Sequence, residues 1–131
     1  MLNRRQRRFS FAPTYKTLQE ILDDGNLAAL GDAYVNLVYS LYLSIKTGSP
    51  KGAKINNRLL SNALRQAGLR NFITSRVDRH KQADAAEALM VYCWLQGLTT
   101  ISRDVYTLRK CKSVDEGFNS LLSEAKRKLN L

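Results

Sequence analysis

The segment HKQADAAEALMVYCWLQG, residues 80–97, constrains the possible folds of this chain more than any other. Alanine, leucine and methionine dominate it, β-branched residues are few, and Gly97 follows its last apolar stretch. This composition favours an α-helix that ends at the glycine. Because small or apolar side chains occur on all sides of the predicted helix, we expect other elements to bury much of it.

The rest of the chain also has a helical pattern. Glycines follow several segments whose apolar residues have helical spacing, and two Ser/Thr-x-x-Glu sequences have the spacing of capping boxes. No segment alternates as a strand would, and no internal repeat occurs. We predict an all-α protein of about six or seven helices: Thr14 or Thr17 to Asp24, then 26–47 capped by Asn26, 55–69, a short element in 69–76, then 80–97, 99–111 and a last helix after Ser113.

The length and the charge suggest one domain that binds a polyanion. With 131 residues and a net charge of +10, the chain divides into a basic arm, 1–13, and a single helical domain, 14–131. No acidic residue occurs between Asp32 and Asp78, although seven lysines and arginines do. A solvated face explains any one of these cations equally well. Together with the arm, however, the block favours a surface that binds phosphate.

Several features indicate a cytoplasmic protein. Cys93 and Cys111 have no further Cys or His at metal-ligand spacing, so we interpret them as reduced thiols. The N-terminus has arginines where a signal peptide needs an apolar core. The apolar stretch 27–45 contains Asp32, Asn36 and several small residues, and it therefore favours a buried helix over a membrane span.

Three carboxylates stand in these apolar surroundings. Asp84 and Glu87 are three residues apart and share one helix face, with His80 one turn earlier. Such pairs are common on solvated faces, so the spacing alone is weak evidence for a site. The apolar flanks strengthen it, because buried carboxylates need a partner or a metal ion.

Asp32 presents the same problem in the helix 26–47. Gly31 precedes it and weakens the helix, which is explained if another helix or a ligand approaches closely. Two apolar helices with unmatched acids would place those acids together around a hard cation such as Mg²⁺ or Mn²⁺. A basic surface beside such an ion suggests phosphodiester chemistry, and hence a metal-dependent nuclease.

At this point a family resemblance becomes visible in three motifs. The sequence LAALGDAYVNLVYSL resembles the signature helix of ribonuclease III, and QADAAEALMVYCWLQG resembles the second motif of that family. Between them, INNRLLSNALRQAGL is similar to the middle segment. The resemblance covers roughly residues 25–100 and implies an all-α endonuclease domain that forms a homodimer and cuts both strands of double-stranded RNA.

The resemblance also implies roles for individual residues. Asp32 matches the signature aspartate, and Asp84 and Glu87 match the acids of the second motif. It implies that these three bind Mg²⁺, which Mn²⁺ can replace, and that Asp32 and Glu87 are catalytic. Hydrolysis would leave 5′-phosphate and 3′-hydroxyl ends. His80 has no clear counterpart, and we expect a structural or RNA-facing role for it.

One departure from the family pattern concerns the first turn of the signature helix. Gly25 and Ala28 stand where further acids are usual, as in the compact Mini-III form, which also lacks a double-stranded-RNA-binding domain. We expect a compact form of this kind, bacterial or archaeal in type. The catalytic domain would then contact RNA itself, and the candidate residues are Arg4, Arg5, Arg7, Arg8, Lys51, Lys54 and Arg58.

Two other functions remain open at this point. A catalytically silent RNA-binding module of the same fold, for example on the ribosome, would explain the missing acid, but it has no use for three carboxylates facing RNA. A DNA-binding helix-turn-helix is only loosely imitated by residues 55–72. Homodimerisation has separate support, because two helices are apolar on more than one face.

Overall fold

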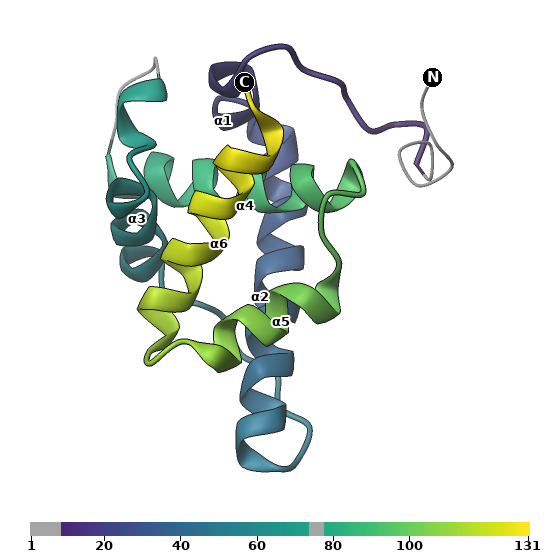
Figure 1. Cartoon of the computed structure of the whole chain (residues 1–131), viewed down its shortest axis with the longest axis vertical. Helices are drawn as coiled ribbons and strands as arrows, with labels where there is room; N and C mark the ends of the chain where they lie inside the picture. Colours follow the sequence, from purple (N-terminus) through teal and green to yellow (C-terminus); the bar gives the residue numbers. More distant parts are fainter. Residues whose placement is uncertain (1–8, 74–77) are drawn as a thin grey trace.

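A computed structural model describes residues 9–73 and 78–131, and it confirms the predicted all-α fold (Figure 1). No strand occurs in these residues. The elements are α1 (Leu18–Leu22), α2 (Gly25–Thr47), α3 (Asn57–Gln66), the short 3-10 helix η1 (Arg70–Phe72), α4 (Arg79–Leu95), α5 (Ile101–Lys110) and α6 (Val114–Leu129). The short element expected in 69–76 is η1, and residues 74–77 lie outside the described part.

Local hydrogen bonds explain where the first helices begin. Thr17 caps α1 through a complete capping box with Glu20, as predicted. The prediction that Asn26 caps α2 was wrong. The carboxylate of Asp24 accepts the N–H of Leu27 at 2.9 Å, so α2 begins at Gly25, and α1 ends at Leu22 rather than continuing to Asp24.

The C-terminal helix is capped by a variant of the predicted box. Ser113 accepts the N–H of Glu116 at 3.2 Å, but the carboxylate of Glu116 accepts the N–H of Lys112, at 3.3 Å, instead of that of Ser113. The last turn carries Lys126, Arg127 and Lys128, which suit the negative end of the helix dipole. Both ends of α6 are therefore specified locally.

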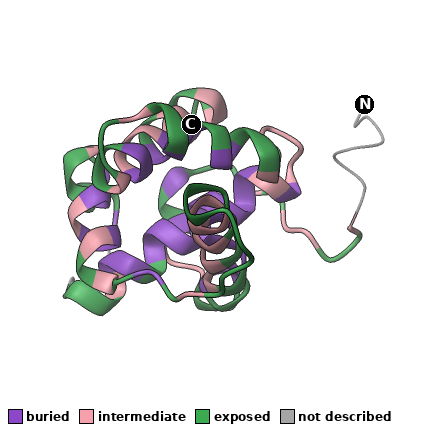
Figure 2. Ribbon diagram, turned by 90° about the horizontal axis from the view of Figure 1, so that it is seen from below, coloured by how far each residue is buried: buried purple, intermediate pink, exposed green. Residues whose placement is uncertain are grey.

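Helix α4 is the centre of the core. It packs against α1, α2, α3 and α6, and nearly every side chain from Gln82 to Leu95 is buried. Figure 2 shows the buried residues gathered on the inner faces of the helices. This confirms the expected helix covered by other elements, although it ends at Leu95 and not at the predicted Gly97. The burial extends to both faces because alanines occupy the positions where other helices approach.

The described end of the N-terminal segment contacts α4. The ring of Phe9 lies 5.5 Å from that of Trp94, and Gln96 donates a hydrogen bond to the carbonyl of Pro13 at 2.8 Å. The backbone N–H of Tyr15 also donates to the hydroxyl of Tyr92. Residues 9–15 are thus attached to the C-terminal half of α4.

Two further expectations concern thiols and membranes. Cys93 and Cys111 are free, as predicted; the first is buried and the second is half-buried. Among the described residues, no helix combines the length and the apolar character that a membrane crossing requires. In Figure 1 the C-terminal end of α2 projects beyond α5 and α6.

Candidate active site

Helices α2 and α4 approach most closely at Gly31. A Cβ atom on Gly31 would lie 2.1 Å from the carbonyl oxygen of Glu87, so no side chain fits there. This confirms that the glycine marks the close approach of another helix, which in this case is α4. The contact places Asp32, the next residue on α2, beside Glu87.

The three predicted acids line one open cleft of about 340 Å³. Asp32 comes from α2, and Asp84 and Glu87 come from successive turns of α4. Glu87 is buried, with 5% of its surface exposed, and Asp32 is half-buried. Asp84 is exposed, so the expected burial of both α4 acids holds only for Glu87. The remaining wall consists of Gly25, Ala28, Ala29, Lys54 and Asn57.

The carboxyl groups of Asp32 and Glu87 share a hydrogen bond, and their pKa values shift in opposite directions. Burial, and then the bond to Asp32, raises the pKa of Glu87 to about 8, from an ordinary value of 4.5. The same bond, followed by Lys54, lowers the pKa of Asp32. Partial burial raises the pKa of Asp84. At neutral pH the pair therefore holds one proton, on Glu87, in a place that a cation could take.

The donor set fits a hard cation, although it does not form a closed cage. In residues 9–73 and 78–131, no group of three or more His, Cys, Asp and Glu side chains is gathered closely enough to hold a metal ion. Mg²⁺ commonly uses one or two carboxylates and completes its shell with water and phosphate oxygens. Asp32 and Glu87, with Asp84 on the same cleft, offer such a set.

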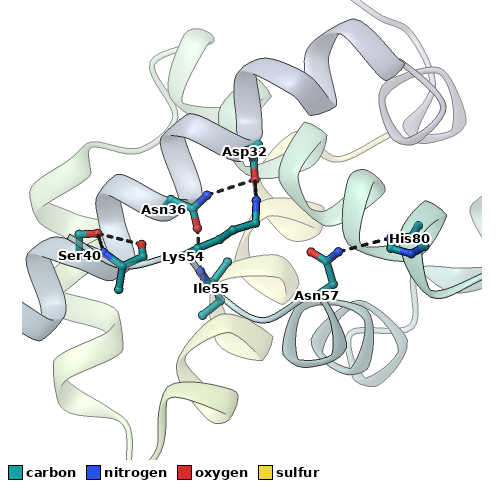
Figure 3. A network of polar contacts seen from close by, with 8 residues as sticks. Asp32, Asn36, Ser40, Lys54, Ile55, Asn57 and His80 are labelled. Atoms are coloured by element: carbon teal, nitrogen blue, oxygen red, sulfur yellow. Dashed lines mark hydrogen bonds and ion pairs between the residues drawn. The ribbon is translucent and has the colours of Figure 1, made fainter.

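A network of hydrogen bonds holds the loop after α2 over Asp32 (Figure 3). Ser40 bonds both the N–H and the carbonyl of Ala53, at 2.9 and 3.1 Å, and Asn36 accepts the N–H of Ile55 at 2.8 Å. These bonds fix the backbone on both sides of Lys54. The ammonium group of Lys54 lies 3.3 Å from Oδ1 of Asp32, which also accepts from Asn36 at 3.1 Å.

A second cleft, of about 530 Å³, adjoins the first and shares Lys54 and Asn57 with it. Arg58, Arg79 and His80 line it, at the starts of α3 and α4. The Nδ1 atom of His80 lies 3.4 Å from the side-chain nitrogen of Asn57. No acid from the described part of the chain lines this cleft. We call it the basic cleft and the first one the acid cleft. The starts of two helices add to its attraction for anions.

The predicted RNA-binding residues divide into three groups. Lys54 and Arg58 line the basic cleft, and Lys51 is exposed on the loop before it. The four arginines of the arm, Arg4, Arg5, Arg7 and Arg8, lie outside the described residues. Sequence reasoning missed Arg79 and Asn57. The signal for Arg79 was its place beside His80 at the start of a helix, and Asn57 belongs to the INN motif.

Comparison with protein families agrees with this geometry. A family model described as Ribonuclease III matches residues 25–127, which include α2 to α5, most of α6 and all three acids. The chain belongs to the ribonuclease III family. Members of this family are endonucleases that process double-stranded RNA, typically with Mg²⁺, and their catalytic domain is all-α, as observed here. A comparison with curated proteins gives no match.

Proposed function

We propose that this ribonuclease III family protein is a Mg²⁺-dependent endoribonuclease. Its substrate is double-stranded RNA, in which it hydrolyses phosphodiester bonds to leave 5′-phosphate and 3′-hydroxyl ends. The observation that carries the proposal is the meeting of three carboxylates from two helices in one cleft, beside a second cleft lined by cations. Without a metal ion, the carboxylates of the acid cleft would repel RNA phosphates, so they would weaken a surface that served only to bind RNA.

Asp32 and Glu87 would bind the metal ion, and Asp84, on the same cleft, would complete the carboxylate set once the ion draws it in. When bound, Mg²⁺ activates water for in-line attack and stabilises the leaving 3′ oxygen. The protein supplies position. Asn36 orients Asp32 through the hydrogen bond to its Oδ1 atom, and the close contact at Gly31 fixes the separation of the two helices. Glu87 would lose its proton as the ion enters.

The basic cleft is suited to the RNA backbone next to the reacting phosphate. Arg58 and Arg79 can each pair with a phosphate, and Asn57 and His80 can donate hydrogen bonds to phosphate or 2′-hydroxyl oxygens. Because the two clefts share Lys54 and Asn57, one strand can pass from one to the other. These contacts read shape and charge, which is how proteins mostly recognise double-stranded RNA.

We also propose a homodimer, because each subunit cuts one strand. Helix α2 exposes one apolar stripe, with spacings of seven, four and four residues, which places its members on the same face. They are Leu30, Leu37, Leu41 and Ile45, whose surfaces are 40%, 45%, 37% and 49% exposed. A second copy would bury this stripe. Sedimentation should show a dimer, Leu37→Lys should give monomers, and Leu131→Lys, at an equally exposed site, should not.

The second candidate function is a catalytically silent RNA-binding module. One observation favours it: the wall of the acid cleft at the first turn of α2 consists of Gly25, Ala28 and Ala29, and has no side-chain ligand. Such a protein would bind duplex RNA and leave it intact in every metal ion. The three acids argue against it.

One experiment separates these functions. The purified protein is incubated with an end-labelled RNA duplex, and with one strand of it alone, in Mg²⁺, Mn²⁺ or EDTA. We expect cleavage of the duplex in either metal and none in EDTA. Glu87→Gln and Asp32→Asn should bind the duplex without cutting it, and Asp115→Asn, which removes an exposed acid of α6, should cut normally. Binding without cleavage by the wild-type protein would support the silent module instead.

A further inference from the structure

Among the residues that the structure describes, Lys54 is the cation that lines both clefts. Its side chain is 69% exposed, but its backbone is fixed by the bonds of Ala53 to Ser40 and of Ile55 to Asn36. Figure 3 shows the side chain reaching from this loop toward Asp32. An isolated surface ion pair contributes little to stability, so the fixed position of Lys54 calls for another explanation.

The charges of the acid cleft suggest one. When ionised, its three carboxylates carry three negative charges, which one Mg²⁺ and one ammonium group balance. A second Mg²⁺ would leave an excess of two positive charges before RNA arrives. It would also lack carboxylate ligands of its own, because the rest of the wall consists of Gly25, Ala28, Ala29, Asn57 and Lys54. The cleft therefore has carboxylates for one ion, and Lys54 already supplies a second positive group beside Asp32.

We infer that the ammonium group of Lys54 takes the place of a second metal ion in this active site. The inference rests on the proposed function. Each subunit then binds one Mg²⁺, and Lys54 donates hydrogen bonds to a non-bridging oxygen of the reacting phosphate. An ammonium group can stabilise negative charge developing on that phosphate, as a metal ion does, without needing carboxylate ligands of its own. Before RNA binds, the ion pair with Asp32 keeps the ammonium group of Lys54 at the acid cleft.

The number of Mn²⁺ ions bound per chain, counted by electron paramagnetic resonance, tests whether Lys54 replaces a second metal ion. This measurement does not depend on catalytic activity. The wild-type protein should bind one ion per chain. Lys54→Ala should still bind one, about tenfold more tightly, because a neighbouring positive charge is gone. Lys54→Glu adds a fourth carboxylate at an exposed position and should bind two. Lys112→Ala, which removes an exposed lysine outside both clefts, should bind one ion with the same affinity as the wild type.

The outcomes separate this inference from the proposed function. Two ions per chain in the wild type, or identical numbers and affinities in all four proteins, would overturn the role of Lys54 and leave the metal-dependent nuclease intact. No bound ion in the wild type would overturn both. A cleavage assay adds a check: Lys54→Ala should lower kcat at saturating Mg²⁺ by about 100-fold, and Lys54→Arg should recover part of the loss. Unchanged kcat in Lys54→Ala would contradict the phosphate contact.

Discussion

Two buried acids, Glu87 and Asp104, have similar exposure but different hydrogen-bond partners. Their surfaces are 5% and 3% exposed, and burial raises the pKa of both. Asp104 accepts hydrogen bonds from the hydroxyl groups of Tyr34 and Thr99, at 2.5 and 2.6 Å. Glu87 instead shares a proton with another acid, Asp32, at the wall of an open cleft.

The difference shows that burial alone does not identify a functional acid. Neutral donors satisfy Asp104, which ties α5 to α2 through Tyr34. Such a group belongs to the scaffold. Glu87 is paired with another acid, and both can ionise at neutral pH only when a cation offsets their negative charges. The cleft of Glu87 is therefore the one that we assign to chemistry.

The largest expected effect comes from exchanging each acid for its amide. Glu87→Gln should lower kcat by about 10³-fold or more, because a metal ligand is lost, while the free energy of unfolding stays the same or rises. Asp104→Asn should lower the free energy of unfolding by about 2 kcal/mol, because one hydroxyl donor loses its acceptor, and leave kcat of the folded protein within about threefold. Denaturant titrations and cleavage rates measure both. Loss of kcat in Asp104→Asn together with loss of stability in Glu87→Gln would show that Asp104 is the functional acid and Glu87 the structural one.

The next prediction concerns the contact that brings Asp32 to Glu87. Gly31→Ala should lower the free energy of unfolding by about 3 kcal/mol, because its Cβ would collide with the backbone of Glu87, which has little freedom to move. Gly25→Ala is the matched control on the same helix. Nothing lies within 4 Å of its added Cβ, so it should be neutral or slightly stabilising. Equal unfolding midpoints for the two variants would show that α2 and α4 tolerate a wider spacing.

A smaller effect depends on pH. Because the pKa of Glu87 is raised to about 8, an incoming ion must displace a proton at neutral pH. Mg²⁺ affinity should therefore fall about tenfold per pH unit below pH 8 and level off above it. Calorimetry in buffers of different ionisation enthalpy should count about one proton released at pH 7 and almost none above pH 9. In Glu87→Gln this proton release should disappear.

The same shift affects the stability of the metal-free protein, and its sign is fixed. The pKa of Glu87 is higher in the folded state than its ordinary value of 4.5, so the folded state binds the proton more tightly. The stabilisation is complete below pH 4.5 and is lost as the pH rises through about 8. Thermal unfolding without metal should show this loss for the wild type and a weaker one for Glu87→Gln.

Much of the fold was predictable because its signals are local. Gly48, Gly68 and Gly97 follow three of the helices with φ values of 79°, 76° and 74°, a conformation that glycine adopts without strain. The start of α2 was not predictable in this way. Asp24 and Asn26 are both good capping residues, and the hydroxyl of Tyr15 bonds Asp24 at 2.5 Å. That contact comes from tertiary structure.

The acid cleft was only partly visible in the sequence. Gly31 and the unmatched acids predicted that two helices meet there, because apolar surroundings leave a carboxylate few alternatives. The position of Lys54 depends on the hydrogen bonds of Ala53 with Ser40, 13 residues away, and of Ile55 with Asn36, 19 residues away. No local pattern specifies these bonds. Asp104 gave no signal either, because one of the donors that satisfy it, Tyr34, is 70 residues away in the chain.

Radical cleavage of the polypeptide can locate the bound metal ion directly. With Fe²⁺ in place of Mg²⁺, ascorbate and peroxide generate hydroxyl radicals that cut the chain next to the ion, and mass spectrometry identifies the cuts. We expect cuts near Asp32 and near Asp84 to Glu87, suppressed by excess Mg²⁺ and absent in Glu87→Gln. Cuts elsewhere, or the same cuts in Glu87→Gln, would contradict a metal ion in the acid cleft.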